Sequence, residues 1–369
     1  MKLGLHVDQL WFDVPGGIGT YVRELWTRLP AIEGLDVVPF RSSWPSDRRV
    51  AWTVPSGAIT TGRHTLRYPL WAALAWPPLP AALSGCDVIH ATNQVAVPPA
   101  RRGLALVVTV HDLAFERFPE AFPTRWRLLQ RASVRAAARR ADAIVVPSLA
   151  TATDLAERHD VDPERIHVTP LAAATPVAAD DPTGTLEALG VARPFVLSVG
   201  TLEPRKNTGR LIRAFRRIAP QVPHSLVLAG PTGWGVRDLT AELAEPPGRI
   251  VRTGGLSPDQ LDALYRSADV FAYPSLYEGF GVPVLEAMLR GLPVVGSTTP
   301  AVAETAGDAA LLVDPTDEEA IADGLRRILT DPALGNDLRA KGRERAAGFS
   351  WDRTAAETVR VYRSVGGAS

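Results

Sequence analysis

Cysteine is nearly absent from this chain of 369 residues, which contains only Cys86. A single cysteine excludes an intramolecular disulfide and any paired-cysteine zinc or redox site, and it favours a reducing compartment. An excess of one charge sign is also missing, because 40 Lys and Arg residues balance 40 Asp and Glu residues. We therefore do not expect the chain to bind nucleic acid.

Long hydrophobic runs are missing as well. The most apolar segment, residues 70–83, is interrupted by Pro77, Pro78 and Pro80 and is shorter than the roughly 20 residues that a membrane-spanning helix needs. Residues 1–9 have the pattern of a strand and lack that of a secretory signal. These absences predict a cytoplasmic protein that does not cross a membrane.

Short runs rich in β-branched residues alternate with longer amphipathic stretches along nearly the whole chain. This alternation is typical of parallel sheets covered by helices. In the first half we expect strands at residues 3–7, 37–40, 88–90, 106–110, 143–146 and 166–169. In the second half we expect strands at residues 195–199, 225–229, 250–253, 270–274, 293–296 and 311–313.

The two sets of strands predict an α/β protein with two doubly wound domains. We expect an N-terminal domain at residues 1–175, a linker with one short helix at 176–194, a second domain at 195–350, and a C-terminal helix at 351–369 that packs back on the first domain. Two such domains facing each other would leave a cleft. Because open α/β sheets bind ligands at the carboxyl ends of their strands, this cleft is the expected site.

Glycines follow the first expected strand. Gly16, Gly17 and Gly19 precede a helical run at residues 21–29, so their backbone amides could approach a phosphate at the positive end of that helix. The spacing differs from that of a GxGxxG motif. A plain turn explains these glycines equally well.

Two glutamates eight residues apart bracket a glycine loop and an expected helix start. Glu278 lies in the loop, at the expected mouth of the cleft, and Pro283 stands near the first position of the helix. Glu286 would lie one turn into that helix, where its carboxylate can accept hydrogen bonds from the vicinal hydroxyls of a ligand. The alternative is a capping carboxylate followed by a solvated helix residue.

Arg205 and Lys206 follow the expected strand 195–199 and Gly200, where a loop leaves the carboxyl end of the second sheet. Lysine is scarce in this chain, and a pair of cations at this edge could neutralise a departing diphosphate. Unpaired surface charges without a function are the alternative. His111 similarly ends the expected strand 106–110, in either a structural or a catalytic role.

The sequence contains no recognisable metal motif. Asp160 and Asp162 have the DxD spacing, but no buried strand precedes them and Pro163 follows, so we expect an exposed turn. Neither a cluster of metal ligands nor a GxSxG or P-loop motif is present. We therefore expect no bound metal.

In this order the motifs resemble those of the retaining family-four glycosyltransferases, which have the GT-B fold, from residue 1 to about residue 365. The specific matches are residues 196–207, 228–231, 254–256, 268–271 and, above all, the Glu-x7-Glu segment 278–286. The looser matches are residues 16–19, 111–112 and 145–148. The chain departs from the pattern at Ala303, where relatives have a proline.

The resemblance implies a role for each candidate residue. Glu286 would bind the ribose of the nucleotide, and Glu278 would contact hydroxyls of the donor sugar. Arg205 and Lys206 would hold the diphosphate. The implied catalytic residues are His111, which would lie beside the reacting sugar, Arg205, Lys206 and Glu278. The implied donor-binding residues are Gly16, Gly17, Gly200, Gly254, Leu256, Phe280, Gly281 and Glu286.

The implied reaction is the transfer of a hexosyl group, with retention of configuration, from a nucleotide-diphosphate sugar to a glycan or lipid-linked acceptor. Fixed cations and helix-terminal amides can stabilise the leaving diphosphate without a metal, so no cofactor is expected. Residues 111–120 resemble those of bacterial polysaccharide-assembly members, which favours mannose or rhamnose as the sugar.

Other protein classes use parts of the same pattern. A glycoside hydrolase also needs two carboxylates but has no use for diphosphate-binding cations. A sugar-nucleotide epimerase of similar two-domain build and a non-catalytic nucleotide-sugar-binding protein both remain open. The missing GxGxxG motif disfavours a nicotinamide dehydrogenase.

Residues 124–140 predict a helix with a basic stripe. Arg127, Arg131, Arg135 and Arg139 recur every four residues, and no acidic residue lies among them. The apolar residues expected to pack inward are Leu128, Leu129, Ala132 and Val134. The stripe favours peripheral contact with an anionic membrane, where each basic residue contributes about 1 kcal/mol. The alternative is an ordinary solvated face.

Overall fold

The computed structural model describes residues 1–12, 16–44, 54–175, 182–233 and 249–367. The chain folds into two compact units. The first unit contains Met1–Glu116, Pro123–Leu171 and Ser350–Ser369, and the second contains Arg117–Phe122 and Ala172–Phe349. Residues 176–181, the first part of the expected linker, lie outside the described residues.

The described part of the first unit contains a seven-stranded parallel sheet with the order β3-β2-β1-β4-β5-β6-β7. Its strands are β1 (Lys2–His6), β2 (Asp36–Arg41), β3 (Ile59–Thr60), β4 (Val88–Ala91), β5 (Ala105–Thr109), β6 (Ala143–Val146) and β7 (Ile166–Val168). The strand order reverses between β1 and β4, as in a doubly wound fold. β3 was not predicted from the sequence, because a strand of two residues is too short to show a pattern.

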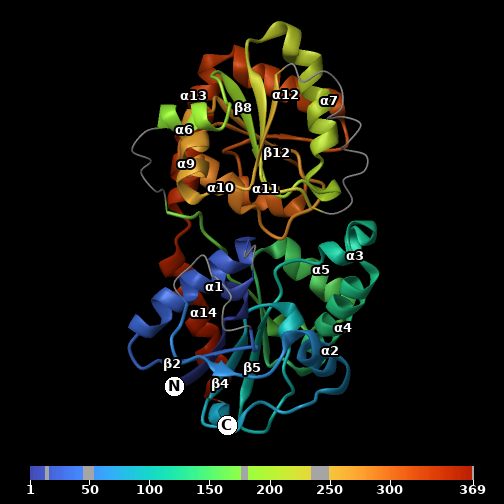
Figure 1. Cartoon of the computed structure of the whole chain (residues 1–369), viewed down its shortest axis with the longest axis vertical. Coiled ribbons are helices and arrows are strands. Elements are labelled where there is room, and N and C mark those ends of the chain that lie inside the picture. The colour runs from blue at the N-terminus through green and yellow to red at the C-terminus, as the bar shows by residue number, and fades with distance from the viewer. Residues whose placement is uncertain (13–15, 45–53, 176–181, 234–248, 368–369) are drawn as a thin grey trace. The chain divides into compact units, whose positions relative to one another are not determined.

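Helices cover both faces of this sheet (Figure 1). They are α1 (Gly16–Arg28), α2 (His64–Leu74), α3 (Ala114–Arg117), α4 (Thr124–Arg140), α5 (Leu149–His159) and α14 (Trp351–Gly366). The C-terminal helix α14 contacts α1, β4, β5 and β6. Tyr362 and Val359 of α14 are fully or almost fully buried there.

The second unit repeats the plan. Its described residues form a six-stranded parallel sheet with the order β10-β9-β8-β11-β12-β13. The strands are β8 (Phe195–Val199), β9 (Ser225–Ala229), β10 (Ile250–Gly254), β11 (Val270–Tyr273), β12 (Val294–Ser297) and β13 (Leu311–Val313). Here the order reverses between β8 and β11, which places the loops after these two strands side by side.

The described residues of the second unit form the helices α6 (Pro182–Ala188), α7 (Thr208–Ile218), α9 (Pro258–Ser267), α10 (Val282–Leu289), α11 (Pro300–Ala306), α12 (Glu318–Thr330) and α13 (Pro332–Ala347). α7 packs beside α12, and α10 packs beside α13 (Figure 1). Leu211, Ile212 and Phe215 of α7 join Leu325 of α12 in the core under the sheet. Their spacing along each helix is that of one buried face.

Short 3-10 helices connect these elements in both units. They are η1 (Asp8–Trp11), η2 (Leu29–Ala31), η3 (Ala81–Leu83), η4 (Gln94–Ala96), η5 (Pro119–Ala121), η6 (Pro163–Arg165), η7 (Pro204–Lys206) and η8 (Ala219–Gln221). The α/β class and the two Rossmann-like domains are therefore as the sequence predicts. The helix after the first strand begins earlier than expected, because Gly16 and Gly17 form its first turn and do not precede it.

Candidate functional site

Glycines let three loops approach one another at the carboxyl edge of the second sheet. The backbone amide of Gly200 donates to Ala229 O, and that of Gly230 donates to Gly254 O, each at 2.9 Å. A Cβ at Gly230 would lie 2.2 Å from Gly200 O, and the φ of Gly230 is +142°. Only glycine fits there. The predicted donor-binding residues Gly200 and Gly254 therefore belong to one tightly packed edge.

Arg205, Lys206 and Glu278 form a single buried cluster. The cations lie on η7, after β8, and Glu278 lies in the loop after the neighbouring strand β11. Lys206 Nζ donates to Glu278 Oε1 and Arg205 Nη1 donates to Glu278 Oε2, both at 2.6 Å. The side chains of Glu278, Lys206 and Arg205 are 8, 14 and 15% exposed. Glu278 is therefore neither a helix cap nor a solvated carboxylate.

Three further groups complete this cluster. Glu203 Oε1 accepts from Arg205 Nε at 2.9 Å and from Arg205 Nη2 at 2.6 Å. Arg205 Nη1 also donates to Tyr277 O at 3.0 Å, and Lys206 Nζ donates to the hydroxyl of Tyr273 at 2.7 Å. Neither Glu203 nor Tyr273 was predicted from the sequence as a site residue. Glu203 stands two residues before the predicted cation pair, and Tyr273 lies within the predicted strand 270–274 and ends β11.

The cations control the charge of Glu278. Burial alone would raise the pKa of Glu278, but Arg205 and Lys206 outweigh burial and hold this pKa at about 2, below its ordinary 4.5. Glu278 is therefore an ionised carboxylate at neutral pH. Such a group accepts hydrogen bonds and donates none.

The loop between Glu278 and α10 is fixed by its own contacts. Gly281 caps α10 with a φ of +109°, a conformation that favours glycine, and Pro283 stands in the first turn as expected. Phe280 is buried with its ring 5.8 Å from that of Phe349, and its carbonyl accepts from Thr305 Oγ1 at 2.7 Å. Both the ring and the carbonyl of Phe280 are therefore held inside the second unit.

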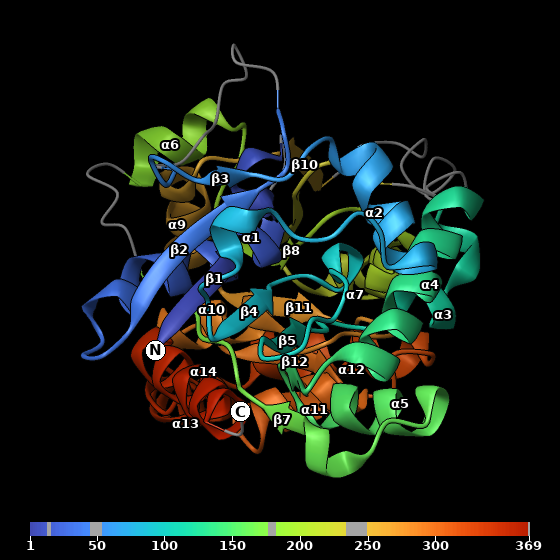
Figure 2. The same ribbon diagram turned by 90° about the horizontal axis from the view of Figure 1, so that it is seen from below.

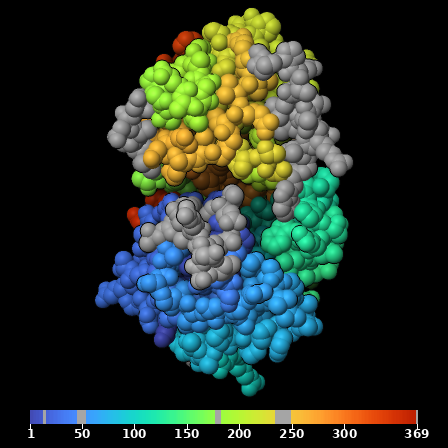
Figure 3. Space-filling view, viewed as in Figure 1, coloured from blue at the N-terminus to red at the C-terminus, as the bar shows by residue number. Residues whose placement is uncertain are grey.

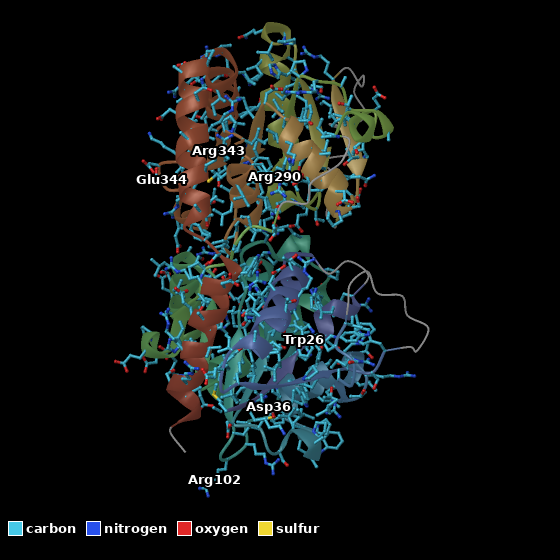
Figure 4. The ribbon with its side chains drawn as sticks, turned by 90° about the vertical axis from the view of Figure 1, so that its left-hand side faces the viewer. Trp26, Asp36, Arg102, Arg290, Arg343 and Glu344 are labelled. Carbon is cyan, nitrogen blue, oxygen red and sulfur yellow. The ribbon has the colours of Figure 1, made fainter. Side chains whose placement is uncertain are left out.

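Glu286 lies in the middle of α10 with partners of its own. Its Oε2 accepts from the hydroxyl of Tyr265 at 3.0 Å. Arg290, labelled in Figure 4, donates to Glu286 O at 3.0 Å and, through Nε, to the buried Asp262 at 2.7 Å. Burial raises the pKa of Glu286, although Tyr265 and Arg290 act in the opposite direction. Tyr265, Arg290 and Asp262 were not expected from the sequence.

Leu256 follows β10, where Gly254 has a φ of +72° and is exposed. Leu256 itself is half-buried. Gly254 thus ends the outer strand of the described sheet and Leu256 follows that strand, whereas the Arg205, Lys206 and Glu278 cluster lies at the β8–β11 switch point.

The remaining predicted residues belong to the first unit. Gly16 and Gly17 are exposed, and a Cβ at either position would meet no atom within 4 Å. His111 follows β5, is 8% exposed, and donates from Nε2 to Thr92 O at 2.9 Å. Burial lowers the pKa of His111, so its ring is neutral at pH 7 with the proton on Nε2.

A chain of buried polar side chains links His111's surroundings to the C-terminal helix. The ring of Tyr21 lies edge-on to His111, with centroids 5.1 Å apart, and its hydroxyl lies 3.0 Å from Thr109 Oγ1. His90 bridges Thr109 Oγ1 at 2.7 Å and the hydroxyl of Tyr362 at 2.6 Å. Burial lowers the pKa of His90 to about 3. The sequence analysis missed this network, whose members come from four separate elements.

The basic stripe lies on α4, on the surface of the first unit beside α2 (Figures 2 and 3). Arg131, Arg135 and Arg139 are exposed and Arg127 is half-buried. Glu116 of α3 lies 3.7 Å from Arg131 and so offsets part of the charge. The expectation that Leu128 packs inward is wrong, because this side chain is 59% exposed. The face of α4 that packs against α2 therefore differs from the face that its apolar residues predict.

The turn at residues 160–163 matches its prediction. Asp160 and Asp162 are exposed, and Asp162 accepts from the amide of Glu164 at 3.0 Å. Among the described residues, no three His, Cys, Asp or Glu side chains gather in an arrangement that could hold a metal ion. No helix in the described ranges is both long enough and apolar enough to span a membrane.

Two family descriptions match the two halves of the chain. Residues 15–173 match "Glycosyltransferase Family 4", and residues 187–345 match "Glycosyl transferases group 1". The chain is 33% identical to the O-antigen chain mannosyltransferase B of Escherichia coli, over 70% of each protein. It is 31% identical to the MMP alpha-(1->4)-mannosyltransferase of Mycolicibacterium hassiacum, over 91% of this chain and 85% of that one.

Solved structures share the fold at lower sequence identity. The sucrose-phosphate synthase of Thermosynechococcus elongatus aligns with a TM-score of 0.76 and 24% identity over 100% of both chains. Anabaena Alr3699/HepE, solved in complex with UDP and glucose, aligns with a TM-score of 0.72 and 20% identity over 99% of this chain and 100% of that one.

Proposed function

The chain belongs to glycosyltransferase family four, and from that premise we propose that it transfers a mannosyl or rhamnosyl group, with retention, from a nucleotide-diphosphate sugar to a glycan or lipid-linked acceptor. Relatives named as mannosyltransferases support the sugar, and a neighbour of the same fold solved with UDP and glucose supports a nucleotide-linked donor. The observation that carries the proposal is the cluster in which Glu278 lies between Arg205 and Lys206.

The roles follow from the chemistry of the bond that breaks. Cleavage between the anomeric carbon and the diphosphate oxygen develops positive charge on the sugar and negative charge on the diphosphate. Lys206 would stabilise the departing diphosphate, and the N-terminus of α1, with Gly16 and Gly17 in its open first turn, would add amide donors. Ionised Glu278 would accept hydrogen bonds from sugar hydroxyls, and Glu286 would bind the ribose.

Retention is accounted for by attack on the face from which the diphosphate leaves. The acceptor oxygen bonds to the anomeric carbon as the bond to the diphosphate breaks, and the acceptor's proton passes to the departing phosphate oxygen. His111 would lie beside the reacting sugar as a neutral ring, which places no positive charge next to the developing cation. No metal is needed in this scheme, because the fixed protein donors act on the diphosphate directly.

The test is a panel of GDP-mannose, dTDP-rhamnose, UDP-glucose and UDP-N-acetylglucosamine, with thermal shift for binding and a radiolabelled sugar for transfer. We expect one donor to stabilise the protein and to support transfer that survives EDTA, with the anomeric configuration retained by NMR. Activity that EDTA abolishes and manganese restores would refute the metal-free scheme. Conversion of the donor without any acceptor would instead identify an epimerase, and binding without turnover a nucleotide-sugar-binding protein.

We also propose that α4 brings the enzyme to the cytoplasmic face of an anionic membrane, where a lipid-linked acceptor is presented. The exposed Arg131, Arg135 and Arg139, with the exposed Leu128 beside them in the helix, support this. Co-sedimentation with vesicles of rising phosphatidylglycerol content should show salt-dependent binding.

The variant with Glu at Arg131 and Arg135 should bind these vesicles weakly. A matched control carries Glu at Arg360 and Arg363, two exposed arginines of α14, and should bind like the wild type. Equal binding by all three proteins would contradict the membrane proposal and favour a water-soluble acceptor.

A further inference from the structure

The contacts of Arg205 differ in kind from those of Lys206. Glu203 Oε1 accepts from both Nε and Nη2 of Arg205, and Tyr277 O and Glu278 Oε2 accept from Nη1. Every nitrogen of this guanidinium therefore donates to the protein. A diphosphate that approached Arg205 would therefore lie beside two carboxylates, those of Glu203 and Glu278, which repel it.

Lys206 has donor capacity left over. Its ammonium group carries three protons and donates to the hydroxyl of Tyr273 and to Glu278 Oε1. One proton remains for a ligand. The ring of Tyr273 also lies 4.9 Å from Nζ and limits the positions that the ammonium can take.

We infer that Arg205 is a positioning residue for Glu278, with Glu203 holding Arg205 in turn, and that Lys206 is the cation of this cluster that meets the diphosphate. This inference rests on the proposed function and revises the diphosphate role that the sequence implies for Arg205. Arg205 and Lys206 each bind one oxygen of Glu278, so the plane of the carboxylate is fixed. The remaining lone pairs of Glu278 then have defined directions toward the hydroxyls of the donor sugar.

Charge explains why Glu203 is part of the arrangement. Two cations and two carboxylates make the buried cluster neutral as a whole, although Glu278 alone would face two positive charges. Glu203 offsets Arg205 on the side away from Glu278. Lys206 is hydrogen-bonded to one carboxylate, whereas Arg205 is hydrogen-bonded to two, and the charge of Lys206 therefore remains the more available one for an anionic ligand.

The experiment separates binding of the diphosphate from binding of the sugar. Dissociation constants for GDP, UDP and dTDP, and for the corresponding nucleotide sugars, are measured by isothermal titration calorimetry, and kcat is measured with the donor that transfers. The variants are Arg205→Gln, Arg205→Lys, Glu203→Gln and Lys206→Met. Thermal melts without ligand establish that each variant is folded.

We expect Lys206→Met to raise the Kd of the nucleoside diphosphate at least tenfold. We expect Arg205→Gln, Arg205→Lys and Glu203→Gln to change that Kd less than twofold but to lower kcat at least tenfold, since none keeps Glu278 held as in the wild type. In a Glu278→Gln background, Arg205→Gln should cause no further loss of kcat, because its effect passes through Glu278.

A rise in the diphosphate Kd for Arg205→Gln as large as that for Lys206→Met would overturn the inference. So would an additive loss of kcat in the Glu278→Gln background. If Arg205→Gln does not fold, Glu203→Gln decides the question, because Glu203 acts on the same guanidinium. Wild-type protein that binds none of GDP, UDP, dTDP and their sugars refutes the proposed function together with this role, whereas a failure confined to the Arg205 and Glu203 variants refutes the role alone.

Discussion

Glu278 should make the stability of the second unit fall at acidic pH, and the variant Glu278→Gln should lack this part of the pH dependence. The carboxylate is buried between Arg205 and Lys206, with a pKa of about 2 in the folded protein and an ordinary value of 4.5. Because the folded pKa is the lower one, the ionised form stabilises the fold above pH 4.5. This stabilisation is lost as the pH falls through 4.5 toward 2.

The size of the effect follows from that difference. A pKa lowered from 4.5 to about 2 corresponds to about 3 kcal/mol of stability at neutral pH. At pH 3 the carboxylate of Glu278 is still mostly ionised in the folded protein but mostly protonated in the unfolded protein. About 2 kcal/mol of its contribution to stability has therefore been lost. The variant has no carboxylate to titrate. Between pH 7 and pH 3 the wild type should therefore lose about 2 kcal/mol more than Glu278→Gln.

The assay is unfolding by urea at a series of pH values, monitored by circular dichroism. Urea is uncharged and therefore leaves the ionic strength unchanged. At pH 7 the variant should be less stable than the wild type by about 3 kcal/mol, because two buried cations lose a shared carboxylate. The matched control is Glu33→Gln, which removes an exposed glutamate of the first unit and leaves the Glu278 cluster intact, so its unfolding should follow that of the wild type. Parallel pH dependence of Glu278→Gln and the wild type would refute the reasoning.

Further predictions concern catalysis and the first unit. Lys206→Ala should lower kcat/KM, because about 3 kcal/mol of transition-state stabilisation is lost. A loss of kcat/KM below about tenfold in steady-state kinetics would remove Lys206 from this role. Glu286→Gln should weaken donor binding more than it lowers kcat, because a ribose contact changes little on the way to the transition state; an unchanged donor Kd in calorimetry would count against the ribose assignment. Tyr362→Phe should destabilise the first unit by about 2 kcal/mol in fluorescence-monitored urea unfolding, because it removes the buried partner of His90 Nδ1, which lies 2.6 Å away. A change below about 0.5 kcal/mol would show that this bond adds nothing.

The strands and several helices could be predicted from the sequence because their causes are local. Parallel strands buried on both faces must be continuous apolar runs, and β6, β8, β9 and β13 coincide with the runs that predict them. The bounds of α4 also match. The Glu-x7-Glu segment and the cation pair were recognisable because their residues stand close together in the chain and the carboxyl ends of strands are where ligands bind.

The start of α1 and the exposure of Leu128 were predicted wrongly for a related reason. Glycine lowers intrinsic helix propensity, yet Gly16 and Gly17 form the first turn of α1, since tertiary context overrides propensity. Which face of α4 is buried depends on α2 and η4, against which it packs, and not on its own apolar residues.

Sequence alone therefore determined the fold class, the succession of strands along the chain and the residue types that follow the strands of the second sheet. Only the tertiary structure decided which charges meet. Lys206 and Glu278 are 72 residues apart in the chain, and Tyr265 and Glu286 lie on different helices. Whether a cation is open to a ligand or held by protein carboxylates depends on such distant partners, because a hydrogen bond acts over about 3 Å of space whatever the separation along the chain.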